Sequence, residues 1–170
     1  MDATHLHLLV NHLPIVGTFL ALPLLLLALL RRADAGALHA ATLVLVLAGA
    51  GAVVAKETGE DAEEGVEHLV GTDEAALNTH EERAEFATPI AVVTALLALG
   101  TVAARAFRPG VTSTVATVVT LASAMGSAGA MAWVGQSGGL IRHIELRDAP
   151  PAAPGERLVG ERGGDDEDHD

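Results

Sequence analysis

The chain of 170 residues contains no cysteine, which excludes disulfide bonds, iron–sulfur clusters and thiolate zinc sites. Aromatic residues are also scarce: there is no tyrosine, one tryptophan and three phenylalanines. A soluble core of this size would normally contain more aromatic side chains. A bundle embedded in lipid can instead use small residues for close helix contact. Because alanine, leucine, valine and glycine dominate the sequence, the composition favours a membrane protein.

Basic residues are few, since 10 Lys and Arg stand against 22 Asp and Glu, for a formal net charge of −12. Most of this charge lies in residues 57–85 and 156–170, and the chain between these segments is nearly uncharged. Nucleic-acid binding requires a basic surface. We therefore expect membrane lipid, and no nucleic acid, among the partners.

Four long apolar runs occupy most of the chain. They cover residues 8–30, 37–55, 86–104 and 111–134. A helix needs roughly 17–25 residues to cross the hydrocarbon core of a bilayer, so each run is long enough. The sequence therefore predicts an all-α fold, a four-helix transmembrane bundle that spans residues 1–148.

Segments outside the apolar runs carry signals of their own. Between the second and third runs, the pattern predicts a short surface helix near 60–69 and a long helix from about residue 73 that enters the membrane near Phe86. The glycine-rich stretch 135–139 predicts a turn that folds the chain back over the bundle. The prolines, glycines and acidic residues of 149–170 predict a disordered tail.

The arginines indicate how the helices are oriented. Arg31 and Arg32 lie in the short first loop, and Arg105 and Arg108 lie in the short third loop. By the positive-inside rule these loops are cytoplasmic, so both termini and the acidic second connection are expected outside. Trp133 then fits an anchor at the outer interface. Because no basic residue precedes the first run, we expect a retained helix rather than a signal peptide.

Six of the eight histidines fall near the outer end of this bundle: His5, His7, His12, His68, His80 and His143. Imidazole is a frequent metal and haem ligand, and it is seldom placed near hydrocarbon without a partner. His12 and His80 are expected at similar depth on two helices, where they could hold haem b between them. His5 and His7 are expected to reach the headgroups, and His39 lies alone at the other end.

A non-haem site for a divalent transition metal is the alternative for the same cluster, because imidazole with carboxylate suits zinc, iron or manganese. The candidate metal ligands are His68, His80, His143, Glu64, Glu67 and Glu81. In the haem hypothesis His68 and His143 are alternate ligands, and Arg142 could neutralise a propionate. Surface ion pairs would explain the same residues without any cofactor.

Catalytic motifs do not accompany these residues. The sequence has no nucleophile–base arrangement and no phosphate-binding loop. The run His80-Glu81-Glu82 lacks the second histidine of a zinc-protease motif, because Ala84 stands at that position. The sequence therefore leans away from an enzyme.

The histidines lie within five motifs: HLHLLVNHLPIVG at 5–17, TGEDAEE at 58–64, VEHL at 66–69, HEE at 80–82 and GGLIRHIELR at 138–147. Together they resemble a family of uncharacterised bacterial four-helix integral membrane proteins. Leu13, Val70 and residues 136–137 depart from the family pattern, and none of them is expected to touch a proposed ligand. The family is similar to four-helix membrane domains that are sometimes joined to Rieske-type proteins. This resemblance implies a place in the bacterial inner membrane and a redox partner.

Three functions stay open at this point. The first is an electron carrier with haem b in the outer half of the bundle. The second is a membrane protein that binds or senses a non-haem metal. The third is a cofactor-free accessory subunit whose acidic outer segment docks a protein partner. Each is compatible with a homo-oligomer.

Overall fold

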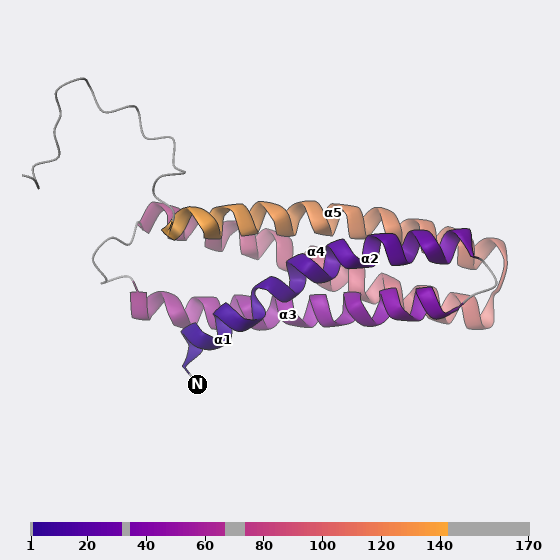
Figure 1. Ribbon diagram of the computed structural model, residues 1–170, viewed down its shortest axis with the longest axis horizontal. Helices are drawn as coiled ribbons and strands as arrows, with labels where there is room; N and C mark the ends of the chain where they lie inside the picture. Colours follow the sequence, from indigo (N-terminus) through magenta and orange to yellow (C-terminus); the bar gives the residue numbers. More distant parts are fainter. Residues whose placement is uncertain (1, 32–34, 67–73, 143–170) are drawn as a thin grey trace, which may run out of the picture.

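The structure is a computed structural model made of helices packed side by side (Figure 1). It describes residues 2–31, 35–66 and 74–142, without the side chains of 63–66, 74 and 142. The helices are α1 (Ala3–Val10), α2 (His12–Leu30), α3 (Gly36–Val66), α4 (Glu74–Phe107) and α5 (Val111–Arg142). The described residues include no β-strand, so the predicted all-α fold is confirmed.

The helices form a four-membered bundle in which α1 and α2 act as one bent member. Helix α2 packs on α3 and α5, α3 packs on α4, and α4 packs on α5, while α1 lies against α3. In Figure 1 the α1–α2 stretch crosses the long axis of the bundle diagonally, and α3, α4 and α5 run along it. Neighbouring members alternate in direction, as short connections between successive helices require.

Each member of the bundle contains a stretch that is long and apolar enough to cross a membrane. These stretches are Ala3–Leu30, Gly36–Ala62, Ala75–Phe107 and Val111–Ile141. All four also expose large apolar side chains outwards, for example Leu30, Leu43, Leu96 and Val115. Apolar surface of this extent is unusual for a soluble monomer and ordinary for a lipid-facing one. The predicted four spans are therefore confirmed by length and composition.

The helices run further than the apolar runs predicted. Residues 56–66 continue α3 without a break, so the expected separate helix near 60–69 is wrong for the part that is described, and residues 67–69 lie outside the described part. A long helix from about residue 73 is confirmed, since α4 is described from Glu74. The predicted tail, 149–170, lies outside the described residues.

The glycine-rich stretch 135–139 was predicted to form a turn. This prediction is wrong, because the stretch is part of α5. Two of its glycines permit close packing instead. A Cβ at Gly135 would lie 2.9 Å from Ile15 Cδ1 on α2, and a Cβ at Gly138 would lie 3.0 Å from His80 Cε1 on α4. These glycines therefore serve the contact between helices, and the helix continues because its neighbours offset the low helix propensity of glycine.

The break between α1 and α2 falls at Asn11 and follows from Pro14. A proline removes one backbone donor and its ring clashes with the carbonyl four residues earlier, which here belongs to Val10. Helix α1 accordingly ends at Val10, and Pro14 occupies the first turn of α2, where a missing N–H is tolerated. The interruption is local, because Asn11 keeps helical dihedrals (φ −61°, ψ −26°) and its N–H donates to His7 O at 2.9 Å.

Small residues let the long helices approach closely. A Cβ at Gly17 of α2 would lie 2.9 Å from Ala48 Cβ on α3, and a Cβ at Gly49 of α3 would lie 3.1 Å from Ala95 Cβ on α4. Contacts of this kind are typical of membrane helices, which lack a hydrophobic driving force for association and depend on close packing.

Hydroxyl side chains also occupy the interior. Thr18 Oγ1 donates to Pro14 O at 2.8 Å within α2, and Thr94 Oγ1 and Ser123 Oγ form a 2.7 Å hydrogen bond between α4 and α5. Such bonds satisfy polar groups where no water is present. Ser127 is fully buried, and its Oγ has no partner among the described residues.

Candidate functional site

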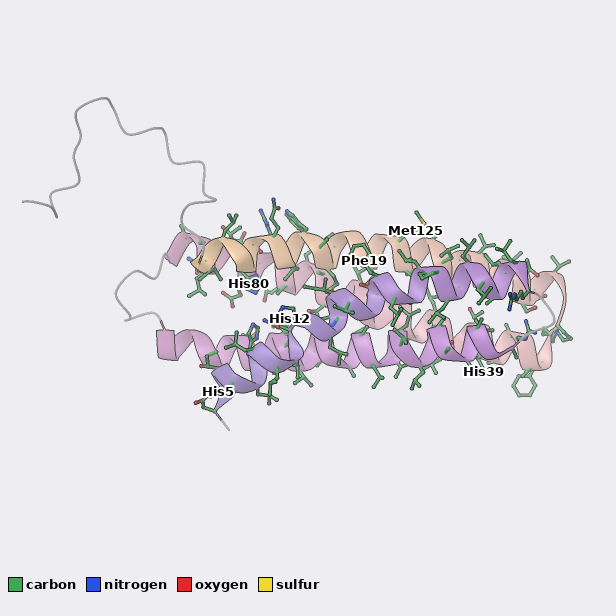
Figure 2. All side chains as sticks on the ribbon, viewed as in Figure 1. His5, His12, Phe19, His39, His80 and Met125 are labelled. Atoms are coloured by element: carbon green, nitrogen blue, oxygen red, sulfur yellow. The ribbon has the colours of Figure 1, made fainter. Side chains whose placement is uncertain are left out.

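The histidines that the structure describes lie at two ends of the bundle. His5, His12 and His80 lie towards one end, and His39 lies towards the other (Figure 2). The predicted gathering of histidines at one end is therefore present for these residues, and the separation of His39 from them is confirmed.

His80 lies in the second turn of α4 and is held by α5. Its Nδ1 donates to Val134 O at 3.2 Å and lies 3.1 Å from Ser137 Oγ, which itself donates to Val134 O at 2.8 Å. A carbonyl oxygen can only accept, so Nδ1 carries the proton and Nε2 of the neutral ring is left as the basic nitrogen. The ring is half-buried and lies directly over Gly138, where no side chain obstructs it.

His7 is held in the same way from the other side of the bundle. It lies on α1, and its Nδ1 donates to Ala55 O on α3 at 2.8 Å. The ring also lies against Gly59, where a Cβ would come within 3.2 Å of its Cε1 and Nδ1 atoms. Each histidine therefore combines an Nδ1 hydrogen bond to a main-chain carbonyl with a glycine beneath the ring.

The imidazoles of His7 and His80 lie next to each other in a T-shaped arrangement. Their ring centroids are 6.5 Å apart and their planes are inclined by 85°. Neither Nε2 has a hydrogen-bond partner within residues 2–31, 35–66 and 74–142. An Nδ1–H anchored on a carbonyl fixes the ring orientation and leaves Nε2 as an electron-pair donor, which is the usual environment of a metal-ligating histidine.

The predicted ligand His12 is placed differently from His7. It is the first residue of α2, its side chain is exposed, and the imidazole that contacts His80 is that of His7. His5 is exposed as well and bonds to Asp2, whose carboxylate accepts from the His5 backbone N–H and ring at 2.8 Å each. The backbone hydrogen bond is the main reason that the pKa of Asp2 lies below its ordinary value.

Most of the other predicted site residues fall where the structure says little. His68, Glu67 and His143 lie outside the described residues. Glu64 and Arg142 belong to α3 and α5, and their side chains are not described. Among the described residues, no group of three or more histidine, aspartate or glutamate side chains could hold a metal ion. Glu81, next to His80, is partly exposed.

An aromatic and cationic cluster lies beside His80. The Arg83 guanidinium lies 4.6 Å above the Trp133 ring and donates from Nη1 to Trp133 O at 3.2 Å. Phe86 meets the same indole edge-on, with centroids 6.2 Å apart. Trp133 and Phe86 are both exposed, which suits anchors at a membrane interface. The buried Nε of Arg83 has no partner among the described residues.

The sequence reasoning missed His7 and Ser137. His7 was assigned to the headgroups together with His5, but the structure places its ring against Ala55 and Gly59 of α3. No sequence signal distinguishes His7 from His5 and His12, because what distinguishes it is a contact with α3. Ser137 belongs to the pair that departs from the resembled family pattern, yet it contacts a proposed ligand, contrary to the expectation that the departures spare the site.

The fold and the site together define an all-α four-helix bundle, suited by length and composition to crossing a membrane, with a histidine pair at one end. Comparison with family models, with curated proteins and with solved structures finds no match to this chain.

Proposed function

We propose that the protein is a membrane electron carrier that binds haem b between His7 and His80. The observation that carries the proposal is the matched anchoring of the two rings. Each Nδ1 donates to a main-chain carbonyl of a neighbouring helix, and each Nε2 lacks a partner among the described residues. The predicted pair of His12 and His80 is thereby replaced by His7 and His80.

The spacing of the rings supports a single metal between them. Two metal–nitrogen bonds of about 2 Å each, made by nitrogens that face one another, put the ring centres roughly 6 Å apart. The observed separation of the centroids is 6.5 Å.

A haem suits this pair better than a bare ion. A bare ion needs three or four protein ligands, and this pair supplies two. His7 and His80 would hold a haem, whose porphyrin brings four further nitrogens, and the group would supply one-electron chemistry. Arg83 lies one turn from His80, and its buried Nε–H has no partner among the described residues. This N–H could donate a hydrogen bond to a haem propionate.

The optical spectrum tests the proposal. Protein from haem-sufficient cells should carry one haem per chain and give a sharp alpha band after reduction. His7→Gln and His80→Gln should abolish this band, because each removes one axial nitrogen. His12→Gln and His5→Gln are matched controls, since both rings are exposed, and they should keep the band. Protein that lacks haem in the wild type, or that loses it only in His12→Gln, would contradict the proposal. Elemental analysis of the same samples separates a haem from a non-haem metal.

A further inference from the structure

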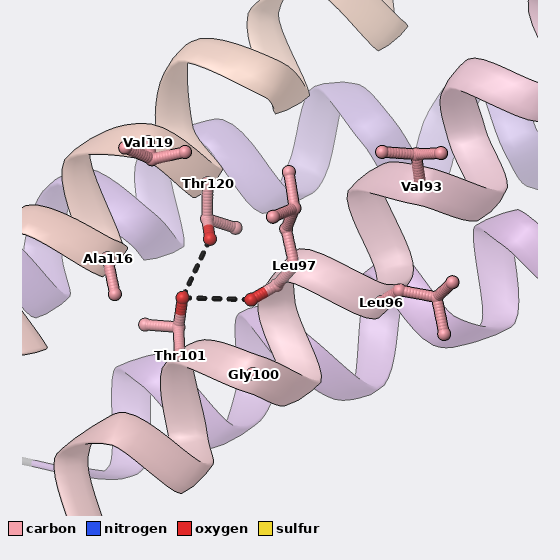
Figure 3. Close-up of a pocket in the computed structure, with 8 residues that line it drawn as sticks. All are labelled: Val93, Leu96, Leu97, Gly100, Thr101, Ala116, Val119 and Thr120. Carbon is pink, nitrogen blue, oxygen red and sulfur yellow. Dashed lines mark hydrogen bonds between the residues drawn. The ribbon is translucent and has the colours of Figure 1, made fainter.

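An apolar groove runs between α4 and α5, far from the histidine pair. Its volume is about 340 Å³, and its walls come from Val93, Leu96, Leu97 and Gly100 on α4 and from Ala116 and Val119 on α5 (Figure 3). All of these residues belong to the stretches that are long and apolar enough to cross a membrane. Gly100 contributes to the open space of the groove, because it has no side chain to occupy it. A Cβ at this position would meet no atom within 4 Å.

The floor of the groove offers no free hydrogen-bond donor. Thr101 Oγ1 donates to Leu97 O at 2.9 Å, so its proton is used. The 2.8 Å hydrogen bond between Thr101 and Thr120 must then take its proton from Thr120 (Figure 3). Since both hydroxyl protons are engaged, the groove suits a hydrocarbon ligand and not a polar one.

The size of the groove selects among apolar occupants. Residues 93–101 of α4 cover about 12 Å of helix axis, so the volume corresponds to a cross-section of roughly 30 Å². One extended hydrocarbon chain fits this section, whereas a helix of about 10–12 Å diameter does not. The groove length of about 12 Å is close to the thickness of one leaflet, which is half of a hydrocarbon core about 30 Å thick.

Charge at the near end of the groove identifies the rest of the ligand. Arg105 follows Thr101 by four residues, or about 6 Å along the helix, and the exposed Arg108 comes just after α4 ends. From Phe86 to Arg142 the sequence contains no aspartate or glutamate, although the whole chain carries a net charge of −12. This end of the α4–α5 hairpin is thus complementary to a phosphate.

We propose that the groove between α4 and α5 holds one acyl chain of a phospholipid whose phosphate lies near the exposed Arg108. Every lipid chain is already in an apolar medium, so the hydrophobic effect does not favour this site. Binding is favoured instead by packing contacts between the acyl chain and the groove walls, and by the attraction between arginine and phosphate. The site does not depend on whether the histidine pair binds haem.

Native mass spectrometry of protein from nanodiscs of phosphatidylcholine and phosphatidylglycerol tests the site. Wild type should retain one phospholipid, preferably phosphatidylglycerol, after transfer to detergent. Gly100→Leu fills the groove and should lower the lipid-bound fraction roughly tenfold. Gly126→Leu is the matched control, since Gly126 is equally open but does not line the groove, and it should retain the lipid.

Two further variants keep the test decisive. Ala116→Leu fills the groove from α5 and should act like Gly100→Leu, including when the latter does not fold. Arg108→Gln should keep a bound phospholipid but lose the preference for phosphatidylglycerol. Equal lipid retention in Gly100→Leu, Ala116→Leu and Gly126→Leu would overturn the proposal. A wild-type dimer that Gly100→Leu converts to monomer would also overturn it, because the occupant would then be a second copy of the chain.

Discussion

The glycine beneath the His80 ring gives a sharp prediction about how the site is built. In Gly138→Ala, the new Cβ would lie 3.0 Å from His80 Cε1 and 3.3 Å from Nδ1. The ring cannot retreat without losing its hydrogen bonds to Val134 and Ser137, which contribute about 1 kcal/mol each. The higher helix propensity of alanine offsets about 1 kcal/mol of this loss. We therefore expect the free energy of unfolding to fall by about 1 kcal/mol.

The neighbouring glycine provides the control. Gly139→Ala meets no atom within 4 Å, so it should leave stability unchanged or raise it by up to about 1 kcal/mol. Reversible unfolding in mixed micelles, followed by circular dichroism on haem-free protein, measures both variants. In a His80→Ala background, Gly138→Ala should become neutral or stabilising, because no ring is left to displace. Equal effects of the two glycine substitutions, or a Gly138→Ala penalty that persists without the His80 ring, would refute the reasoning.

Three further predictions concern the bundle itself. Gly17→Val should destabilise the protein by about 1–3 kcal/mol in the same unfolding assay, because a Cβ at Gly17 already lies 2.9 Å from Ala48 Cβ. Thr120→Val should lower the free energy of unfolding by about 1 kcal/mol. The double variant Thr101→Val/Thr120→Val should lose less than the sum of the two single variants, since the two hydroxyls share one hydrogen bond. Arg83→Met should alter the fluorescence of the single tryptophan, because it removes the guanidinium 4.6 Å from the indole.

The fold was largely predictable because it depends on long-range averages of the sequence. Runs such as 8–30 and 111–134 are long and uncharged enough that small errors at their ends do not change the architecture. The ends themselves were less predictable. Residues 56–66 are polar, yet they continue α3, because the helix gains from propensity and from ion pairs such as Lys56 with Glu60 even beyond the apolar run.

The candidate site was predictable only in part, because it depends on local register. A gathering of histidines near one end follows from topology alone, and it is present for the described residues. Which imidazole contacts His80 depends on how α1 lies against α3: His5 and His12 are both exposed, whereas His7 is part-buried against Ala55. The glycines under the rings were equally ambiguous, since Gly138 suits a turn or a close helix contact, and only the neighbouring helix decides between them.

Electron paramagnetic resonance of the oxidised, haem-loaded protein tests the central claim most directly. The planes of the two imidazoles are inclined by 85°. If both rings held a ferric haem in this orientation, the iron would give a low-spin signal of large anisotropy. The account predicts this signal in wild type and in His12→Gln, and its loss in His7→Gln and His80→Gln. A high-spin signal in wild type, or a low-spin signal that survives His7→Gln and disappears in His12→Gln, would contradict it.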